Sequence, residues 1–264
     1  MALETAAAPE PPSTRPELPG MSFLEHLEEL RRRILYSLVA VAVGFGVGWY
    51  YVERIYGYVQ GPVVTALHKA GKSEQLVYLN PTEPFNLYLK VALLAGVFLA
   101  CPFILYQVWA FIAPGLYRNE KRYVIPFMVG TIFLFLAGGY FGYWLVYPAA
   151  LTFLIEFGKQ FQPMITIGEY TDLFLTVILG LGLVFEMPVL VFFLSLMGVV
   201  SAGWMWRNFR YSILVIFIIA AILTPTTDIL NMCIFAAPMV VLYALSIGIA
   251  YLFHPKRRKA KAEV

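Results

Sequence analysis

Long apolar runs, separated by shorter polar segments, follow one another along most of the chain. A helix rises about 1.5 Å per residue and a bilayer core is about 30 Å thick, so about 20 apolar residues cross it. Six runs predict an all-α integral membrane protein with six transmembrane helices: Ile34–Val52, Phe85–Ile112, Tyr123–Tyr147, Leu173–Val200, Tyr211–Leu223 and Asn231–Phe253. The fifth run is short and crosses only if its flanks enter the membrane or the bilayer thins.

The polar segments predict the domain limits and the orientation. Residues 1–20 have the Pro, Ala and Glu content of a disordered tail, residues 21–254 hold the six spans, and residues 255–264 form a basic tail. With the N-terminus inside, 14 of the 19 Lys and Arg residues lie on the inner side. The five on the outer side are Arg54, Lys69, Lys72, Lys90 and Lys159. The positive-inside rule therefore places both termini in the cytoplasm.

Composition narrows the class of protein further. The chain is 60% hydrophobic and 13% charged, more apolar than a soluble domain of this size can bury. Its two cysteines lie in apolar runs and its three histidines share no metal-ligand spacing. No Ser/His or metal constellation occurs within the spans, so we expect no enzymatic activity, cofactor, metal or nucleic-acid partner.

One carboxylate lies inside an apolar run. Glu186 is the only charged residue of segment 173–200, and a carboxylate in mid-membrane costs at least about 2.5 kcal/mol. One interpretation is a protonated carboxyl bonded to the carbonyl of Val184, which Pro188 leaves without its usual donor. The other, which we favour, is a docking point for a helix of another chain, or a proton relay.

Acidic residues also accompany the arginines before the first span. In "SFLEHLEELRRR", Glu28 is spaced to pair with Arg32 and Glu29 with Arg33 along one helix. Anchoring of the topology explains the arginines, but an anionic membrane surface repels the glutamates. Glu120, between the second and third spans, lies among basic residues, and composition alone favours a local salt-bridge cluster there.

Two groups of glycines are spaced for close helix packing. Gly44, Gly46 and Gly48 lie in the first run, and Gly138 and Gly142 in the third. Such faces let backbones approach closely. Packing within the chain is favoured over docking of a partner.

Four segments, in this order and spacing, resemble the TatC family, the multi-spanning receptor subunits of the twin-arginine protein translocase: "FLEHLEELRRR", "ILYQVWAFIAPGLYRNEKR", "VFEMPV" and "LTPTTD". The resemblance extends from about Ser22 to His254. It implies a cup-shaped protein of six helices in the bacterial inner membrane, with both termini cytoplasmic. It also implies binding of twin-arginine signal peptides of folded cargo, recruitment of TatA and TatB, self-association in a receptor complex, and transport driven by the proton-motive force.

The resemblance also implies roles for individual residues. The family's signal-peptide-binding positions match Glu29, Glu120, Arg31 and Phe111. Its outer-loop and second-span prolines match Pro62 and Pro102, and its partner-binding intramembrane acid matches Glu186. Family members often carry Gln shortly after the Asp that follows "LTP", but here Asp228 is followed by Ile-Leu-Asn, and Thr227 or Asp228 can cap the sixth helix.

Other functions remain open at this point. A proton-coupled small-solute transporter with Glu186 as relay is the main alternative. Such a transporter usually has several midplane polar groups and an internal repeat, and neither is visible. A purely structural scaffold would not need Glu186.

Overall fold

The computed structural model describes residues 23–73, 75–112, 124–161, 164–224 and 228–253, which are mostly helical. The one bridge between extended segments within these residues is parallel and joins Val77 to Thr166. Six apolar helices agree in number and order with the six predicted spans. Five are long enough to cross a membrane and one is shorter: Leu24–Tyr50, Glu83–Ile112, Ile125–Phe157, Ile167–Leu196, Ile229–Leu252, and the short Phe209–Leu223.

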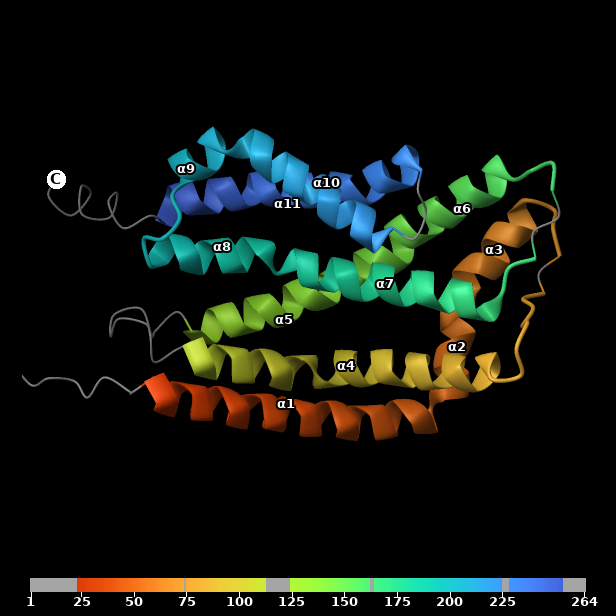
Figure 1. Ribbon diagram of the computed structural model, residues 1–264, viewed down its shortest axis with the longest axis horizontal. Coiled ribbons are helices and arrows are strands. Elements are labelled where there is room, and N and C mark those ends of the chain that lie inside the picture. The colour runs from red at the N-terminus through yellow and green to blue at the C-terminus, as the bar shows by residue number, and fades with distance from the viewer. Residues whose placement is uncertain (1–22, 74, 113–123, 162–163, 225–227, 254–264) are drawn as a thin grey trace, which may run out of the picture.

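The helices run back and forth between two ends of a bundle (Figure 1). Those within the spans are α1 (Phe23–Tyr50), α4 (Glu83–Ile112), α5 (Val124–Phe141), α7 (Ile167–Phe185), α8 (Met187–Leu196), α10 (Phe209–Leu223) and α11 (Ile229–Phe253). The start of α1 and the end of α11 lie at one end, here called the terminal end, together with α9 (Ala202–Arg207). The opposite end, the cap end, carries α2 (Val52–Val59), α3 (Gly61–Lys69) and α6 (Tyr147–Phe157).

The third span is longer than predicted. A π-helical turn, Gly142–Val146, joins α5 to α6, so helix continues to Phe157 instead of ending at Tyr147. Pro148 directly follows the predicted end of this span at Tyr147. It is tolerated in the first turn of α6 because the π-helical turn before it already shifts the hydrogen bonds that proline would break.

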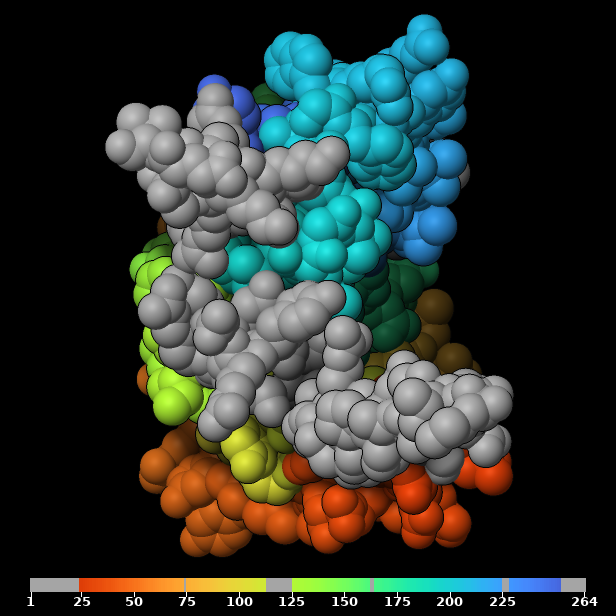
Figure 2. Space-filling view, turned by 90° about the vertical axis from the view of Figure 1, so that its left-hand side faces the viewer, coloured from red at the N-terminus to blue at the C-terminus, as the bar shows by residue number. Residues whose placement is uncertain are grey.

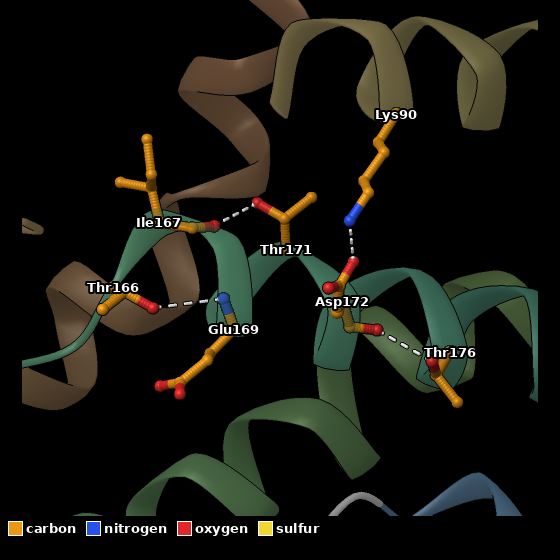
Figure 3. A network of polar contacts seen from close by, with 7 residues as sticks. All are labelled: Lys90, Thr166, Ile167, Glu169, Thr171, Asp172 and Thr176. Carbon is orange, nitrogen blue, oxygen red and sulfur yellow. Dashed lines mark hydrogen bonds and ion pairs between the residues drawn. The ribbon is translucent and has the colours of Figure 1, made fainter. Parts of the chain in front are cut away.

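Near the cap end, polar contacts start α7 and join it to α4 (Figure 3). The side-chain oxygen of Thr166 accepts a hydrogen bond from the backbone N–H of Glu169 at 3.3 Å. This cap starts α7 one to two turns before the predicted Leu173. Lys90 of α4 forms an ion pair with Asp172 of α7. A lysine inside an apolar span needs a partner or water, but its position in the sequence does not reveal which acid supplies the contact.

Tyrosine hydroxyls attach α2 to the bundle. Tyr143 donates a hydrogen bond to the carbonyl oxygen of Tyr58 at 2.9 Å, and Tyr170 donates to that of Val59. Both acceptors lie in the last turn of α2, where carbonyls lack partners within the helix. The cap end is therefore fastened to the spans by bonds from side chains to backbone.

α1 and α4 pack backbone to backbone along a stripe of small residues. A Cβ atom on Gly44 would lie 2.6 Å from the carbonyl oxygen of Gly96, and one on Gly48 would lie 2.6 Å from that of Ala92. A Cβ atom on Gly46 would meet nothing within 4 Å. Packing within the chain, the favoured interpretation of this motif, is confirmed for Gly44 and Gly48.

This contact predicts a difference between two neighbouring glycines. Gly44→Ala should destabilise the protein by about 1–3 kcal/mol, because the new methyl group overlaps a backbone atom that cannot rotate away. Gly46→Ala, the matched control, should be neutral or stabilising. Thermal unfolding midpoints of the two variants in detergent measure the difference. Equal midpoints would show that α1 does not pack on α4 in this register.

Candidate functional site

The glycine contact sets the register in which α1 and α4 meet at the terminal end, the face shown in Figure 2. Arg33 precedes Gly44 by as many residues as Gln107 follows Gly96, so the antiparallel helices bring the two polar residues together. Nη1 of Arg33 donates to Oε1 of Gln107 at 3.0 Å. Nη2 of the same guanidinium donates to Oε1 of Glu29, one turn earlier in α1, at 3.1 Å.

Glu29 is buried although it is an acidic side chain. It is 9% exposed, and Gln107 is 4% exposed. Oε2 of Glu29 and Nε of Arg33 are buried and have no hydrogen-bond partner among the described residues. A buried oxygen without a donor costs free energy. The carboxylate therefore has capacity for one more donor.

Aromatic rings lie beside this polar group. The rings of His26 and Phe111 stack with centroids 4.3 Å apart and planes inclined by 17°. His26 lies about one turn before Glu29 in α1, and Phe111 follows Gln107 by one turn of α4. Two predicted site residues, Glu29 and Phe111, are thus placed at one contact between helices. Arg31 is exposed and lies on another side of α1.

The predicted charge pairs of α1 have different outcomes. The ion pair between Glu29 and Arg33 is confirmed at 3.1 Å. Glu28 and Arg32 are both exposed and form no ion pair within the described part of the chain. The entropy of two long exposed side chains offsets so weak an attraction. Glu120 lies outside the described residues.

Gln107 is a site residue that the sequence interpretation missed. It lies in "YQVWAF", a stretch that reads as an aromatic belt at the membrane interface. The available signal was an amide one helical turn before Phe111, hence on the same face of the helix. Only the contact with α1 shows that this amide is buried and holds Arg33.

Glu186 lies at the break between α7 and α8, inside the fourth span. Its backbone N–H donates to the carbonyl oxygen of Leu183 at 3.1 Å, and Pro188 follows in the first turn of α8. About 15 Å of helix separates Glu186 from the end of the fourth span at Leu196, half the thickness of a bilayer core of about 30 Å.

Glu186 was interpreted either as a protonated carboxyl bonded to the carbonyl of Val184, or as a docking point or proton relay. Oε1 is buried and has no hydrogen-bond partner among the described residues, so this atom makes no bond to the carbonyl of Val184. The carboxylate of Glu186 is half-buried and keeps one acceptor atom without a partner among the described residues.

Three other predicted positions have local structural roles. Pro102 lies inside α4 and is exposed. Pro62 lies in the first turn of α3, where a missing N–H has no cost. Oδ1 of Asp228 accepts a hydrogen bond from the N–H of Asn231 at 2.7 Å, so Asp228 caps α11. Thr227, the other candidate cap, lies outside the described residues.

The described residues hold no group of three His, Cys, Asp or Glu side chains suited to a metal ion. Cys101 and Cys233 are free. Buried Glu29 and half-buried Glu186 each keep one carboxylate oxygen that has no hydrogen-bond donor among the described residues. The fold and these sites define a multi-pass membrane protein with acidic positions that can receive cationic or polar groups.

Comparisons with known proteins assign the family. Residues 25–238 match the family described as "Sec-independent protein translocase protein (TatC)", and the chain belongs to this family. The protein of that name from Koribacter versatilis is 69% identical over 246 residues, which are 93% of this chain and 91% of the relative. The one from Aquifex aeolicus is 34% identical over 90% of this chain and 98% of the relative.

A solved structure agrees with the family assignment. The "Crystal Structure of Twin Arginine Translocase Receptor- TatC" matches with a TM-score of 0.77 at 34% identity. The match covers 86% of this chain and 98% of the solved chain, so the predicted architecture of six spans is confirmed. The chain is a multi-pass membrane component of the Sec-independent, or Tat, protein translocase.

Proposed function

We propose that this protein is the receptor subunit of the translocase. It binds the twin-arginine signal peptides of folded proteins at its cytoplasmic face, recruits TatA and TatB, and works in a process driven by the proton-motive force. The observation that carries the proposal is the carboxylate of Glu29 at the terminal end of the bundle. It is 9% exposed, and its Oε2 has no hydrogen-bond partner among the described residues.

The chemistry of the two partners is complementary. A twin-arginine signal presents two adjacent guanidinium groups, and each is a planar fork that fits a carboxylate with two parallel hydrogen bonds. Glu29 receives one of them. Glu120, in the segment that joins α4 to α5, is proposed to receive the other. An ammonium group lacks the fork, so lysine in place of arginine should bind more weakly.

The neighbouring residues support the same role. Phe111, stacked on His26, offers an apolar wall for the residues beside the arginine pair. Arg31, exposed on α1, is proposed to contact the bound peptide from the other side of the helix. Pro62 and Pro102 are proposed to hold the shape of the cap end and of α4.

The proposed orientation follows the basic residues. The terminal end is cytoplasmic, since 14 of the 19 Lys and Arg residues are assigned to that side. The membrane is the bacterial inner membrane, and several copies of the chain assemble in a receptor complex. Cargo then meets Glu29 from the cytosol before transport.

Glu186 is proposed to receive the partner subunits. A helix of TatA or TatB with a polar side chain at the matching depth is proposed to donate a hydrogen bond to the half-buried carboxylate of Glu186, whose Oε1 has no partner among the described residues. Hydrogen bonds between membrane helices contribute only about 0.6–2 kcal/mol. Glu186 therefore sets the register of the partner more than its affinity.

Export of a folded reporter tests the proposed function. A strain that lacks its own TatC should export a folded protein with a twin-arginine signal once this chain and its cognate TatA and TatB are supplied. The same reporter with a twin-lysine signal should stay in the cytoplasm. A reporter that stays inside although all three subunits reach the membrane contradicts the proposal. The solute-transporter alternative predicts no export in either case, and family membership disfavours it.

A further inference from the structure

Arg33 supplies the same chemical group to Glu29 that a signal peptide brings. Its Nη2 donates to Oε1 of Glu29 at 3.1 Å, and the two residues are 22% and 9% exposed. A carboxylate so buried is costly when it has no counterion. In this structure Arg33 is that counterion.

The hydrogen bond from Arg33 to Glu29 is weaker than the paired hydrogen bonds that an incoming guanidinium can make with the same carboxylate. Only one N–H of Arg33 reaches Glu29, and it occupies one oxygen, whereas a guanidinium that uses its fork engages both. Oε2 of Glu29 and Nε of Arg33 are buried and find no hydrogen-bond partner in the part of the chain that the structure describes. The internal pair thus leaves hydrogen-bonding capacity unfilled on both sides.

Gln107 gives Arg33 a second acceptor. Its Oε1 accepts from Nη1 of Arg33 at 3.0 Å, and its side chain is 4% exposed on α4. If Glu29 is taken by another guanidinium, Arg33 still has its hydrogen bond to Gln107. Release of Arg33 from Glu29 does not strand a buried charge without any partner.

We propose that Arg33 is an internal competitor for Glu29, which a signal-peptide guanidinium must displace, and that Gln107 holds the displaced side chain. Arg33 stabilises the empty receptor and lowers its affinity for cargo, so that a bound peptide can later leave. This inference rests on the proposed function, because it assumes that Glu29 binds the signal. It adds a residue that tunes affinity through Glu29 without contacting the peptide.

Arg33→Gln tests the competition. In membranes that contain the full chain with TatA and TatB, a labelled twin-arginine signal peptide should bind Arg33→Gln on the order of tenfold more tightly than the wild type, the scale of coupling between close buried charges. Arg33→Lys keeps the competing charge and should restore binding toward the wild-type value. A merely structural role for Arg33 predicts weaker binding or none, never tighter binding.

Arg32→Gln is the matched control. It removes the same charge from the same turn of α1, but Arg32 is exposed and pairs with no acid among the described residues. Its affinity should stay within about twofold of the wild type, since exposed charges are screened by salt. Equal tightening in Arg32→Gln and Arg33→Gln would overturn the proposal, because general electrostatics would then explain both.

If Arg33→Gln fails to fold, Gln107→Glu tests whether Arg33 competes with the signal peptide for Glu29. The new carboxylate draws Arg33 away from Glu29 without deleting it, so the peptide should again bind more tightly. Glu29→Gln combined with Gln107→Glu should abolish that gain, which separates competition from direct binding to the new carboxylate. Unchanged or weaker binding in folded Gln107→Glu protein overturns the role of Arg33.

The outcomes also separate this inference from the proposed function. If Glu29→Gln alone binds the peptide like the wild type, Glu29 is not the receptor and the proposed site fails. If Glu29→Gln loses binding while Arg33→Gln shows no gain, the site stands and only the competitor role of Arg33 is wrong.

Discussion

Glu29→Gln should reduce crosslinking of a twin-arginine signal peptide by about thirtyfold or more. Loss of one partner from a buried, hydrogen-bonded charge pair costs about 2 kcal/mol or more, and each 1.4 kcal/mol is a factor of ten. Glutamine has the size of glutamate, and its amide oxygen can still accept from Arg33. The change therefore removes the charge and leaves the contact between α1 and α4 in place.

Glu28→Gln is the control for this experiment. Glu28 precedes Glu29 directly, is exposed, and loses the same charge, so crosslinking should stay close to that of the wild type. The measurement is the yield of photocrosslinks between a labelled signal peptide and the chain in membranes. Full crosslinking to folded Glu29→Gln protein would remove Glu29 from the proposed site.

Glu186→Ala should weaken the association of partner helices by about three- to thirtyfold, the range that corresponds to 0.6–2 kcal/mol. The alanine side chain removes the acceptor at the break between α7 and α8, inside the fourth span. Binding of the signal peptide should persist, because Glu29 belongs to α1 and lies at the terminal end of the bundle, away from the fourth span. Copurification of TatA and TatB with the chain measures the first effect, and peptide crosslinking measures the second.

Two further variants show what the carboxyl group of Glu186 does. Leu183→Ala removes an exposed side chain one turn away, 66% accessible, and should leave partner association unchanged. Glu186→Gln keeps a hydrogen-bonding group that cannot relay a proton, so it should retain both partner association and export. Intact assembly without export in Glu186→Gln would favour a proton relay instead. Equal loss of peptide and partner binding in Glu186→Ala would indicate a folding defect.

Much of the fold followed from local pattern. The apolar runs predicted six spans in the right order, because a bilayer demands that each crossing segment satisfy its backbone within one helix. The boundaries were less accurate. The third span was predicted to end at Tyr147, but a π-helical turn carries the helix on to Phe157. Thr166 caps α7 earlier than the apolar pattern alone indicated.

Some residues of the candidate sites could be predicted from the sequence, and others could not. A buried charge in an apolar run is visible without coordinates, so Glu186 stood out at once. Glu29 stood out through its resemblance to a known motif and through the ion pair with Arg33 along one helix. The contact of Gln107 with Arg33 and the ion pair of Lys90 with Asp172 could not be predicted, because each joins residues far apart in the chain.

The sequence by itself determined that this chain spans a membrane, how many times it crosses, and which acidic residues the membrane environment disfavours. Those properties depend on side-chain hydrophobicity and on spacing along single helices. Only the tertiary structure decided that Glu29 is buried, that Arg33 lies between it and Gln107, and that Phe111 closes the same contact. The reason is the approach of Gly44 to Gly96, which sets the register of two antiparallel helices and is a property of the pair.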